Sequence, residues 1–330
     1  MIDILKRVLP RKQYVWMFCS VLFFIPALFF YYNKDQTDLS KTKIGDNLGR
    51  DILSTVAPNA ILITTEDSAT FNTWYVHYVL GVRKDVNIFI PVNVIDPYFA
   101  PEREKVKSSQ RQLKDPHQIE VETFKLVKKK KRIYSNQPVN FDKDFVWIPR
   151  GIVYELMYRK DIPSREVYLK DSAAIWKNLH APTRKNLLLA ERNLTITSIS
   201  TIYSNGLLQT GDFFIDAYND VPTGLTYYKK AIDVDDENAG AYEKTSYANF
   251  LMTKNCDQTE KDLRNAIFFS DTPSTSKREY ANLFYLYKLC DKKERANELK
   301  KEYFDVFHES FDSIFEKKPP KGQSASQLKK

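Results

Sequence analysis

The chain has 330 residues, enough for about two domains, and 43% hydrophobic residues, enough to form packed cores. Its formal charge of +8 is concentrated in short clusters separated by mixed acidic and basic residues, which excludes an extended nucleic-acid-binding stripe. Three cysteines exclude a disulfide scaffold.

The first element is an apolar segment without a charged residue, from Gln13 to Asn33. About 20 such residues in a helix span a bilayer, and aromatic residues stand near both ends, where they favour the interface. We therefore predict a transmembrane helix over 13–33, following a basic cytoplasmic segment over 1–12. The alternative, a cleaved signal peptide, is disfavoured because no small-residue cleavage site follows.

The excess of basic residues before this segment sets the expected topology. Lys6, Arg7, Arg11 and Lys12 are opposed only by Asp3. The positive-inside rule then predicts a single-pass membrane protein with its N-terminus in the cytoplasm and its C-terminal domains outside. The lipid bilayer is accordingly an expected partner.

Residues 34–185 are predicted to form a small extracytoplasmic α/β layer domain. A helix is expected over 45–56, because Pro58 prevents it from continuing. Residues 100–120 read as a long loop or an exposed helix. Short apolar runs predict four strands, at 61–63, 86–90, 132–136 and 151–158.

The loop after the first predicted strand is the candidate binding site, because ligands usually lie there in such units. It carries carboxylates, hydroxyls and, further on, an aromatic ring that could bind a sugar, a cation or a peptide: Thr65, Glu66, Asp67, Thr70 and Trp74. The alternative for Asp67 or Ser68 is a helix cap. For Trp74, with Tyr75, Tyr78 and Val79 at helical spacing, core packing is favoured.

The same passage carries a family resemblance. Its matching residues are Asn59, Ala60, Ile61, Leu62, Thr64, Asp67, Thr70, Phe71, Trp74, Tyr75, Arg83, Asp85 and Val86. It resembles the segment after the last membrane helix in bacterial multi-pass proteins of the protein O-mannosyltransferase-like family, over about residues 13–160. The chain departs where that family has Gly-Asp-Asn-Asp, because 66–69 read Glu-Asp-Ser-Ala and lose one acidic position.

Residues 186–316 are predicted to be tetratricopeptide-like helical repeats. The segment Tyr-Ala-Asn-Phe at 247–250 recurs as Tyr-Ala-Asn-Leu at 280–283, and Cys256 recurs as Cys290. A period of about 34 residues is typical of that repeat. A bridge between Cys256 and Cys290 is one alternative, but unpaired cysteines are favoured because equivalent repeat positions need not meet. Residues 317–330 are predicted to be a disordered tail.

The sequence shows no catalytic set, no metal-ligand spacing and no cofactor motif, so none is assigned. In the family that the chain resembles, the catalytic acid lies in an early loop between membrane helices, which is absent here. Two functions follow as expectations. The chain is an accessory or C-terminal region of a glycosyltransferase-like system of the protein O-mannosylation type, binding an acceptor polypeptide, a catalytic partner or a glycan. Alternatively, it is a non-enzymatic anchored scaffold that binds envelope proteins through its repeats.

Overall fold

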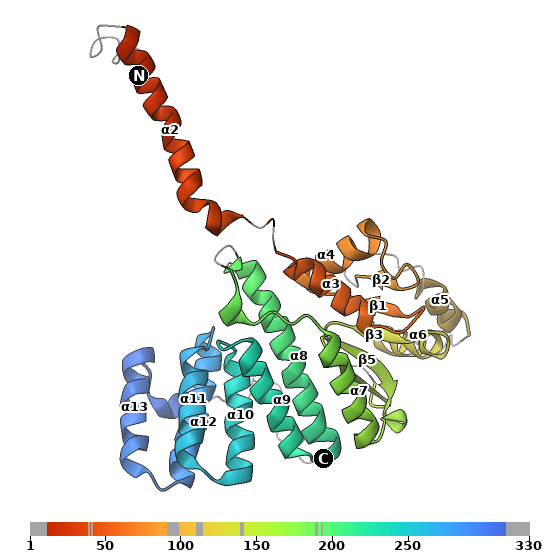
Figure 1. The fold of residues 1–330 in the computed structure, drawn as a ribbon. Helices are drawn as coiled ribbons and strands as arrows, with labels where there is room; N and C mark the ends of the chain where they lie inside the picture. Colours follow the sequence, from red (N-terminus) through yellow and green to blue (C-terminus); the bar gives the residue numbers. More distant parts are fainter. Residues whose placement is uncertain are drawn as a thin grey trace.

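The computed structural model describes residues 12–38, 40, 42–90, 99–109, 115–138, 142–188, 191–192 and 194–314. Figure 1 shows one helix that leads to an α/β layer, followed by helices α8 to α13 side by side. The predicted tail over 317–330 lies outside the described residues, as does most of the predicted basic segment over 1–12.

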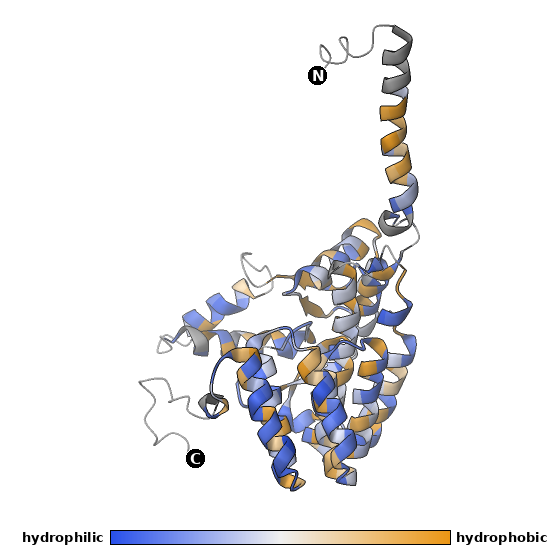
Figure 2. Cartoon of the chain, turned by 90° about the vertical axis from the view of Figure 1, so that its left-hand side faces the viewer, coloured by the Kyte–Doolittle hydropathy of each residue, from blue (hydrophilic) through white to orange (hydrophobic). Residues whose placement is uncertain are grey.

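The first helix, α2 (Lys12–Thr37), stands away from the rest of the chain (Figure 1). Its exposed apolar run over 21–30 is the orange stretch in Figure 2. Tyr31, Tyr32, Asn33 and Lys34 follow within the same helix.

In the part of the chain that the structure describes, no helix combines the length and apolarity needed to cross a membrane. The prediction of a transmembrane helix over 13–33 was therefore wrong. The single-pass topology and the membrane localisation, which rested on this span, were wrong with it. The lipid bilayer as a partner stays a prediction. The fold class is accordingly corrected to helices and a five-stranded sheet.

The sheet has the strand order β2-β1-β3-β5-β4. Strands β2, β1 and β3 are parallel, whereas β5 is antiparallel to both β3 and β4. The bounds are β1 Ile61–Ile63, β2 Asn87–Phe89, β3 Ile133–Ser135, β4 Phe145–Arg150 and β5 Val153–Tyr158. Four of the five were predicted, and β4 was not.

The alternation of side chains along the strands gives the sheet two cores. On one face, Leu62 and Tyr134 pack with α3 (Ile44–Thr55) and with α8 (Leu194–Tyr218). On the other face, Ile61, Ile63 and Ile133 belong to a core that also contains Phe99 and, from α6, Phe124 and Val127. The helices of that second layer are α5 Ala100–Ser109 and α6 Pro116–Lys130. The exposed-helix alternative for 100–120 thus describes α5 better than a long loop does.

Helix α8 belongs to two cores at once. Ile199 and Tyr203 pack in the core with α3, whereas Leu207 and Phe214 pack in the next core with Ile148 of β4. Gly206 allows this close passage, since a Cβ there would lie 2.7 Å from the carbonyl oxygen of Gly151. Before α8 come α7 Arg165–Asn178 and the 3₁₀ turns η2 Arg159–Asp161 and η3 Arg184–Asn186.

The remaining helices form antiparallel neighbours that continue the row begun by α8 (Figure 1). Asp220, Asn238, Asn255 and Thr272 cap helix starts with their side chains. The helices are α9 Val221–Val234, α10 Ala239–Thr253, α11 Cys256–Phe268, α12 Pro273–Leu289 and α13 Lys293–Phe307, followed by the 3₁₀ turn η5 Phe311–Ile314.

A disulfide bond joins Cys256 to Cys290, with 6.3 Å between their Cα atoms. The expectation of unpaired cysteines was wrong. The start of α11 lies beside the end of α12 because the two helices are antiparallel neighbours. The two cysteines therefore meet although they stand 34 residues apart.

Candidate functional site

The predicted site lies at the carboxyl end of β1, where the chain turns into α4 (Asp67–Trp74). The backbone N–H and the hydroxyl of Thr65 both donate to the Asn136 side-chain oxygen, at 2.9 and 3.2 Å. Asn136 follows β3, so these bonds tie together the ends of two neighbouring parallel strands. Sequence reasoning did not identify Asn136, although its place directly after a strand was the available signal.

Glu66 and Asp67 stand at the start of α4 with different surroundings. Glu66 is the N-cap residue and makes no side-chain capping bond to the helix start, and burial raises the pKa of its carboxyl. Asp67 is exposed and is the first residue of the helix. The capping alternative for Asp67 or Ser68 is thus replaced by Glu66 at the cap position.

The other two predicted residues lie further along α4. Thr70 is buried and its backbone N–H donates to the Glu66 carbonyl oxygen at 2.8 Å. Trp74 ends the helix, about 10 Å along the helix axis from Asp67 at 1.5 Å per residue. Thr65, Glu66 and Asp67 therefore share one loop, whereas Trp74 stands apart from them.

Three buried polar atoms around α4 have no hydrogen-bond partner among the described residues. They are the hydroxyls of Thr64 and Thr73 and the indole nitrogen of Trp74. A buried polar group without a partner costs free energy, so such groups are uncommon in native proteins. Within the described residues, this end of β1 and α4 is therefore polar but incompletely satisfied.

The core prediction for the aromatic residues that follow Trp74 was wrong. Tyr75, Tyr78 and Val79 are exposed, whereas Val76 and His77 are buried. The chain makes a π-helical turn, η1 (Tyr75–Val79), directly after α4. Because a π-turn takes more residues than an α-turn, it changes which side chains face the core.

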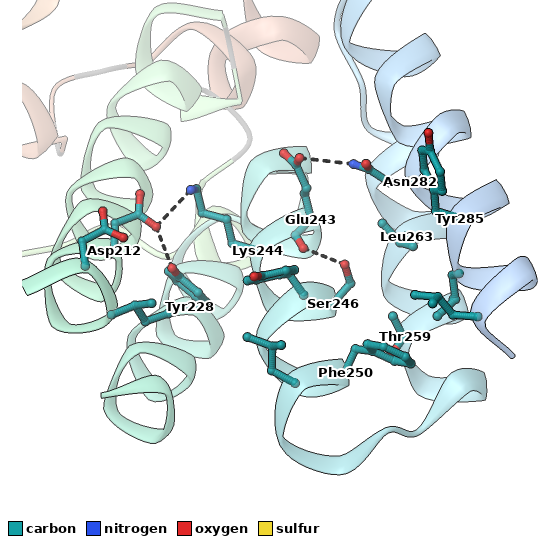
Figure 3. A pocket seen from close by; sticks show the side chains of 16 residues that line it. Asp212, Tyr228, Glu243, Lys244, Ser246, Phe250, Thr259, Leu263, Asn282 and Tyr285 are labelled. Carbon is teal, nitrogen blue, oxygen red and sulfur yellow. Dashed lines mark hydrogen bonds and ion pairs between the residues drawn. The ribbon is translucent and has the colours of Figure 1, made fainter. Parts of the chain in front are cut away.

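A second candidate site is a groove of about 640 Å³ on the helical row (Figure 3). It is formed by side chains from five consecutive helices, α8 to α12. The lining residues are Asp212, Ile215, Asp216, Tyr228, Glu243, Lys244, Ser246, Tyr247, Phe250, Leu251, Thr259, Leu263, Asn282, Tyr285, Leu286 and Leu289. We refer to this set as the groove.

The apolar surface of the groove is accessible. Tyr247 of α10 is 63% exposed and Tyr285 of α12 is 52% exposed, and both line the groove. Leu251 and Leu289 are also exposed there. Tyrosine combines a large apolar ring with a polar tip, which makes it a frequent binding residue. The groove can thus contact both apolar and polar parts of a ligand.

Polar contacts hold the walls of the groove in place (Figure 3). Asp212 accepts a hydrogen bond from the Tyr228 hydroxyl at 2.6 Å and forms an ion pair with the Lys244 ammonium at 2.9 Å. Glu243 accepts from Arg278 at 2.7 Å and from Asn282 at 3.4 Å. These bonds neutralise two of the carboxylates and restrict the side chains to which they belong.

The sequence repeat does not extend to side-chain environments. Tyr247 is exposed in the groove, whereas Tyr280, its counterpart in the repeat, is buried and stacks edge-on against Tyr303. Sequence reasoning predicted that the helical surface binds a partner but named no groove residue. The tyrosine that recurs in the repeat was the available signal, and it would have been correct for Tyr247 but not for Tyr280.

The described residues contain no group of three or more His, Cys, Asp or Glu side chains placed to hold a metal ion.

Residues 45–202 match the family model of TMEM260-associated domain 2. No curated protein matches the chain. The matched region begins in α3, contains the whole sheet and ends within α8. It does not reach α9 to α13, so the tetratricopeptide-like assignment stays a prediction. Over residues 45–202 the chain is thus similar to TMEM260-associated domain 2, which fits a TMEM260/O-mannosyltransferase-like family and is compatible with a glycosyltransferase-like system.

Proposed function

We propose that this chain is an accessory part of a glycosyltransferase-like system of the protein O-mannosylation type, and that it binds the acceptor polypeptide. The match to TMEM260-associated domain 2 supports the glycosyltransferase-like setting. The groove supports the binding role, and it is the observation that carries the proposal.

The groove has the chemistry that an extended polypeptide requires. Tyr247, Tyr285 and Leu289 offer accessible apolar area to side chains. The hydroxyl of Tyr247 and the side-chain oxygen of Asn282 offer hydrogen bonds to a peptide backbone. Since its walls belong to packed helices and are fixed by ion pairs, little ordering is needed on binding.

The test uses the complete chain and short fluorescent peptides rich in Ser and Thr, the residues that accept O-linked sugars. Tyr247→Ala and Tyr285→Ala should each weaken peptide binding about tenfold, as expected for aromatic residues at the centre of an interface. Fluorescence anisotropy measures the Kd. Phe304→Ala is the matched control, because Phe304 is 54% exposed on α13 and does not line the groove.

The outcomes separate the proposal from its alternative. Equal binding by the tyrosine variants and by the Phe304 variant would overturn the groove as the site. The alternative is a non-enzymatic scaffold that uses the same helices. It predicts that peptides with Ala in place of Ser and Thr bind equally well, whereas an acceptor-binding groove prefers the hydroxyl-bearing peptides.

A further inference from the structure

A second hollow lies at the opposite edge of the sheet from the β1–α4 loop, beside the amino ends of β1 and β3. Its volume is about 500 Å³. The lining residues are Ser54, Thr55, Val56, Ala57, Pro58, Arg83, Arg132, Tyr134, Arg150, Glu155, Asp171, Ala174 and Ile175. We refer to it as the arginine hollow.

One buried carboxylate in this hollow is shared by two guanidinium groups. Glu155 is 1% exposed and accepts from Arg132 through Nε at 2.7 Å and Nη2 at 3.1 Å. It also accepts from Nε of Arg150 at 3.3 Å. A single buried negative charge therefore faces two positive charges, of which Arg150 is largely buried and Arg132 is half-exposed.

The other charges near the hollow are half-exposed or lie outside the set of residues that lines it. Asp171 pairs with Nη1 of Arg150 at 3.3 Å, but about half of its side chain is exposed, so solvent screens it. Lys128 interacts electrostatically with both Glu155 and Arg132. Within the hollow, Arg132 and Arg150 thus stand against the buried Glu155 and the half-exposed Asp171, and Lys128 interacts with Asp161 as well.

Arg83 also lines the hollow but has no N–H group left for a ligand. Its guanidinium donates to the carbonyl oxygens of Leu53, Val56 and Ala57 and to both carboxylate oxygens of Asp85. All of its N–H groups are used. Because three of these bonds cover carbonyls at the end of α3, they also offset the negative end of that helix dipole.

Arg132 and Arg150 retain donors. Among the described residues, Nη1 of Arg132 and Nη2 of Arg150 have no acceptor, and both arginines line the hollow. A guanidinium fork matches the spacing of oxygens on a phosphate or a carboxylate. Two forks held by one buried carboxylate are fixed in orientation before any ligand arrives.

We propose that the arginine hollow binds a phosphate group, with Arg132 and Arg150 as its donors and Glu155 as the residue that positions them. A phosphate carries more charge and more acceptor oxygens than a carboxylate, so it suits two separated donors better. The source of the group is either a free phosphate or a lipid head group. This proposal does not depend on the groove.

Isothermal titration of the complete chain with inorganic phosphate at constant ionic strength tests the proposal. Arg132→Lys keeps a charge beside Glu155 but loses the fork, and should weaken binding about tenfold. Asp171→Asn removes the opposing charge and should tighten binding about two- to fivefold. Lys129→Gln is the control, because Lys129 is exposed near the same edge and lies outside the hollow.

Two opposite shifts from two conservative substitutions would support the site, and neither variant leaves Glu155 without a cationic neighbour. Binding of phosphate that is unchanged by Arg132→Lys and Asp171→Asn, or reduced equally by Lys129→Gln, would overturn it. Absence of phosphate binding to the wild-type chain would overturn it as well. Co-sedimentation with phosphatidic acid vesicles, lost in Arg132→Lys, would identify a head group as the source, and phosphate binding without co-sedimentation would identify a free phosphate.

Discussion

Arg83 shows how one side chain can join two separate parts of the chain. Its backbone takes a positive φ of 53°, which is unusual for a residue with a side chain. Its guanidinium donates to carbonyl oxygens at the end of α3 and so joins that helix end to the turn before β2. Asp85 completes the arrangement by accepting from Arg83 and from the backbone N–H of Asn59. These three residues carry part of the family resemblance, and their role in this structure is to hold the fold.

Asp85 predicts a specific pH dependence of stability. The hydrogen bonds from Arg83 hold the pKa of the Asp85 carboxyl well below its usual range. A depressed pKa in the folded state stabilises the protein above about pH 4 and loses this contribution as pH falls through the folded pKa. Asp85→Asn should therefore be less stable at neutral pH and should lose less stability on acidification to about pH 3. Urea midpoints measured across that range check this, and parallel curves for the two proteins would contradict it.

The sequence could locate the binding loop but not its support. Thr65, Glu66 and Asp67 follow an apolar run, and that local pattern is enough to place them after a strand. Asn136 lies 71 residues beyond Thr65 and joins the loop only because β1 and β3 are neighbours in the sheet. Such a contact depends on strand order, which no local pattern specifies.

Elements with a regular period were predictable, and irregular ones were not. Helix α3 and strands β1, β3 and β5 were expected close to where they lie. Strand β4 was missed because Pro149 interrupts its apolar pattern, and it is accommodated because β4 is an edge strand. The π-turn η1 was missed because its exposed aromatic residues have the spacing of a buried α-helical face.

The disulfide bond gives a prediction for the helices that it joins. It closes a chain separation of 34 residues, and a loop of that size is expected to contribute about 3–4 kcal/mol to the free energy of unfolding. The double substitution Cys256→Ser with Cys290→Ser should lose about this amount in urea unfolding. A reducing agent should destabilise the wild-type chain and leave the double variant unchanged. Equal sensitivity of both proteins would contradict the role of the bond.

On the scale of the whole molecule, Asp51 links the α/β layer to the helical row. It is buried in α3 and accepts from the Tyr203 hydroxyl of α8 at 2.7 Å. It also accepts from the backbone N–H of His180 at 2.6 Å and from the His180 ring at 2.8 Å. The family match ends at residue 202, one residue before Tyr203 completes this contact.

We expect the layer and the first helices of the row to unfold together. Asp51→Ala leaves donors on Tyr203 and His180 without their acceptor, at a cost of about 2–4 kcal/mol. Calorimetry should show a single main transition that moves to lower temperature in this variant. Arg50→Ala, at the exposed neighbouring position, is the control and should leave it unchanged. Two well-separated transitions, only one of them shifted by Asp51→Ala, would show that the parts are independent.

Helix α8 runs unbroken from one core into the next. The number of residues between its two packed segments therefore fixes the orientation of one core relative to the other. One residue inserted between Tyr203 and Leu207 would turn the rest of the helix by about 100° and advance it by about 1.5 Å. Gly206 would leave Gly151, and every later helix would turn with it. Substitutions along α8 can be absorbed one contact at a time, but insertions and deletions there would reorient the groove relative to the sheet.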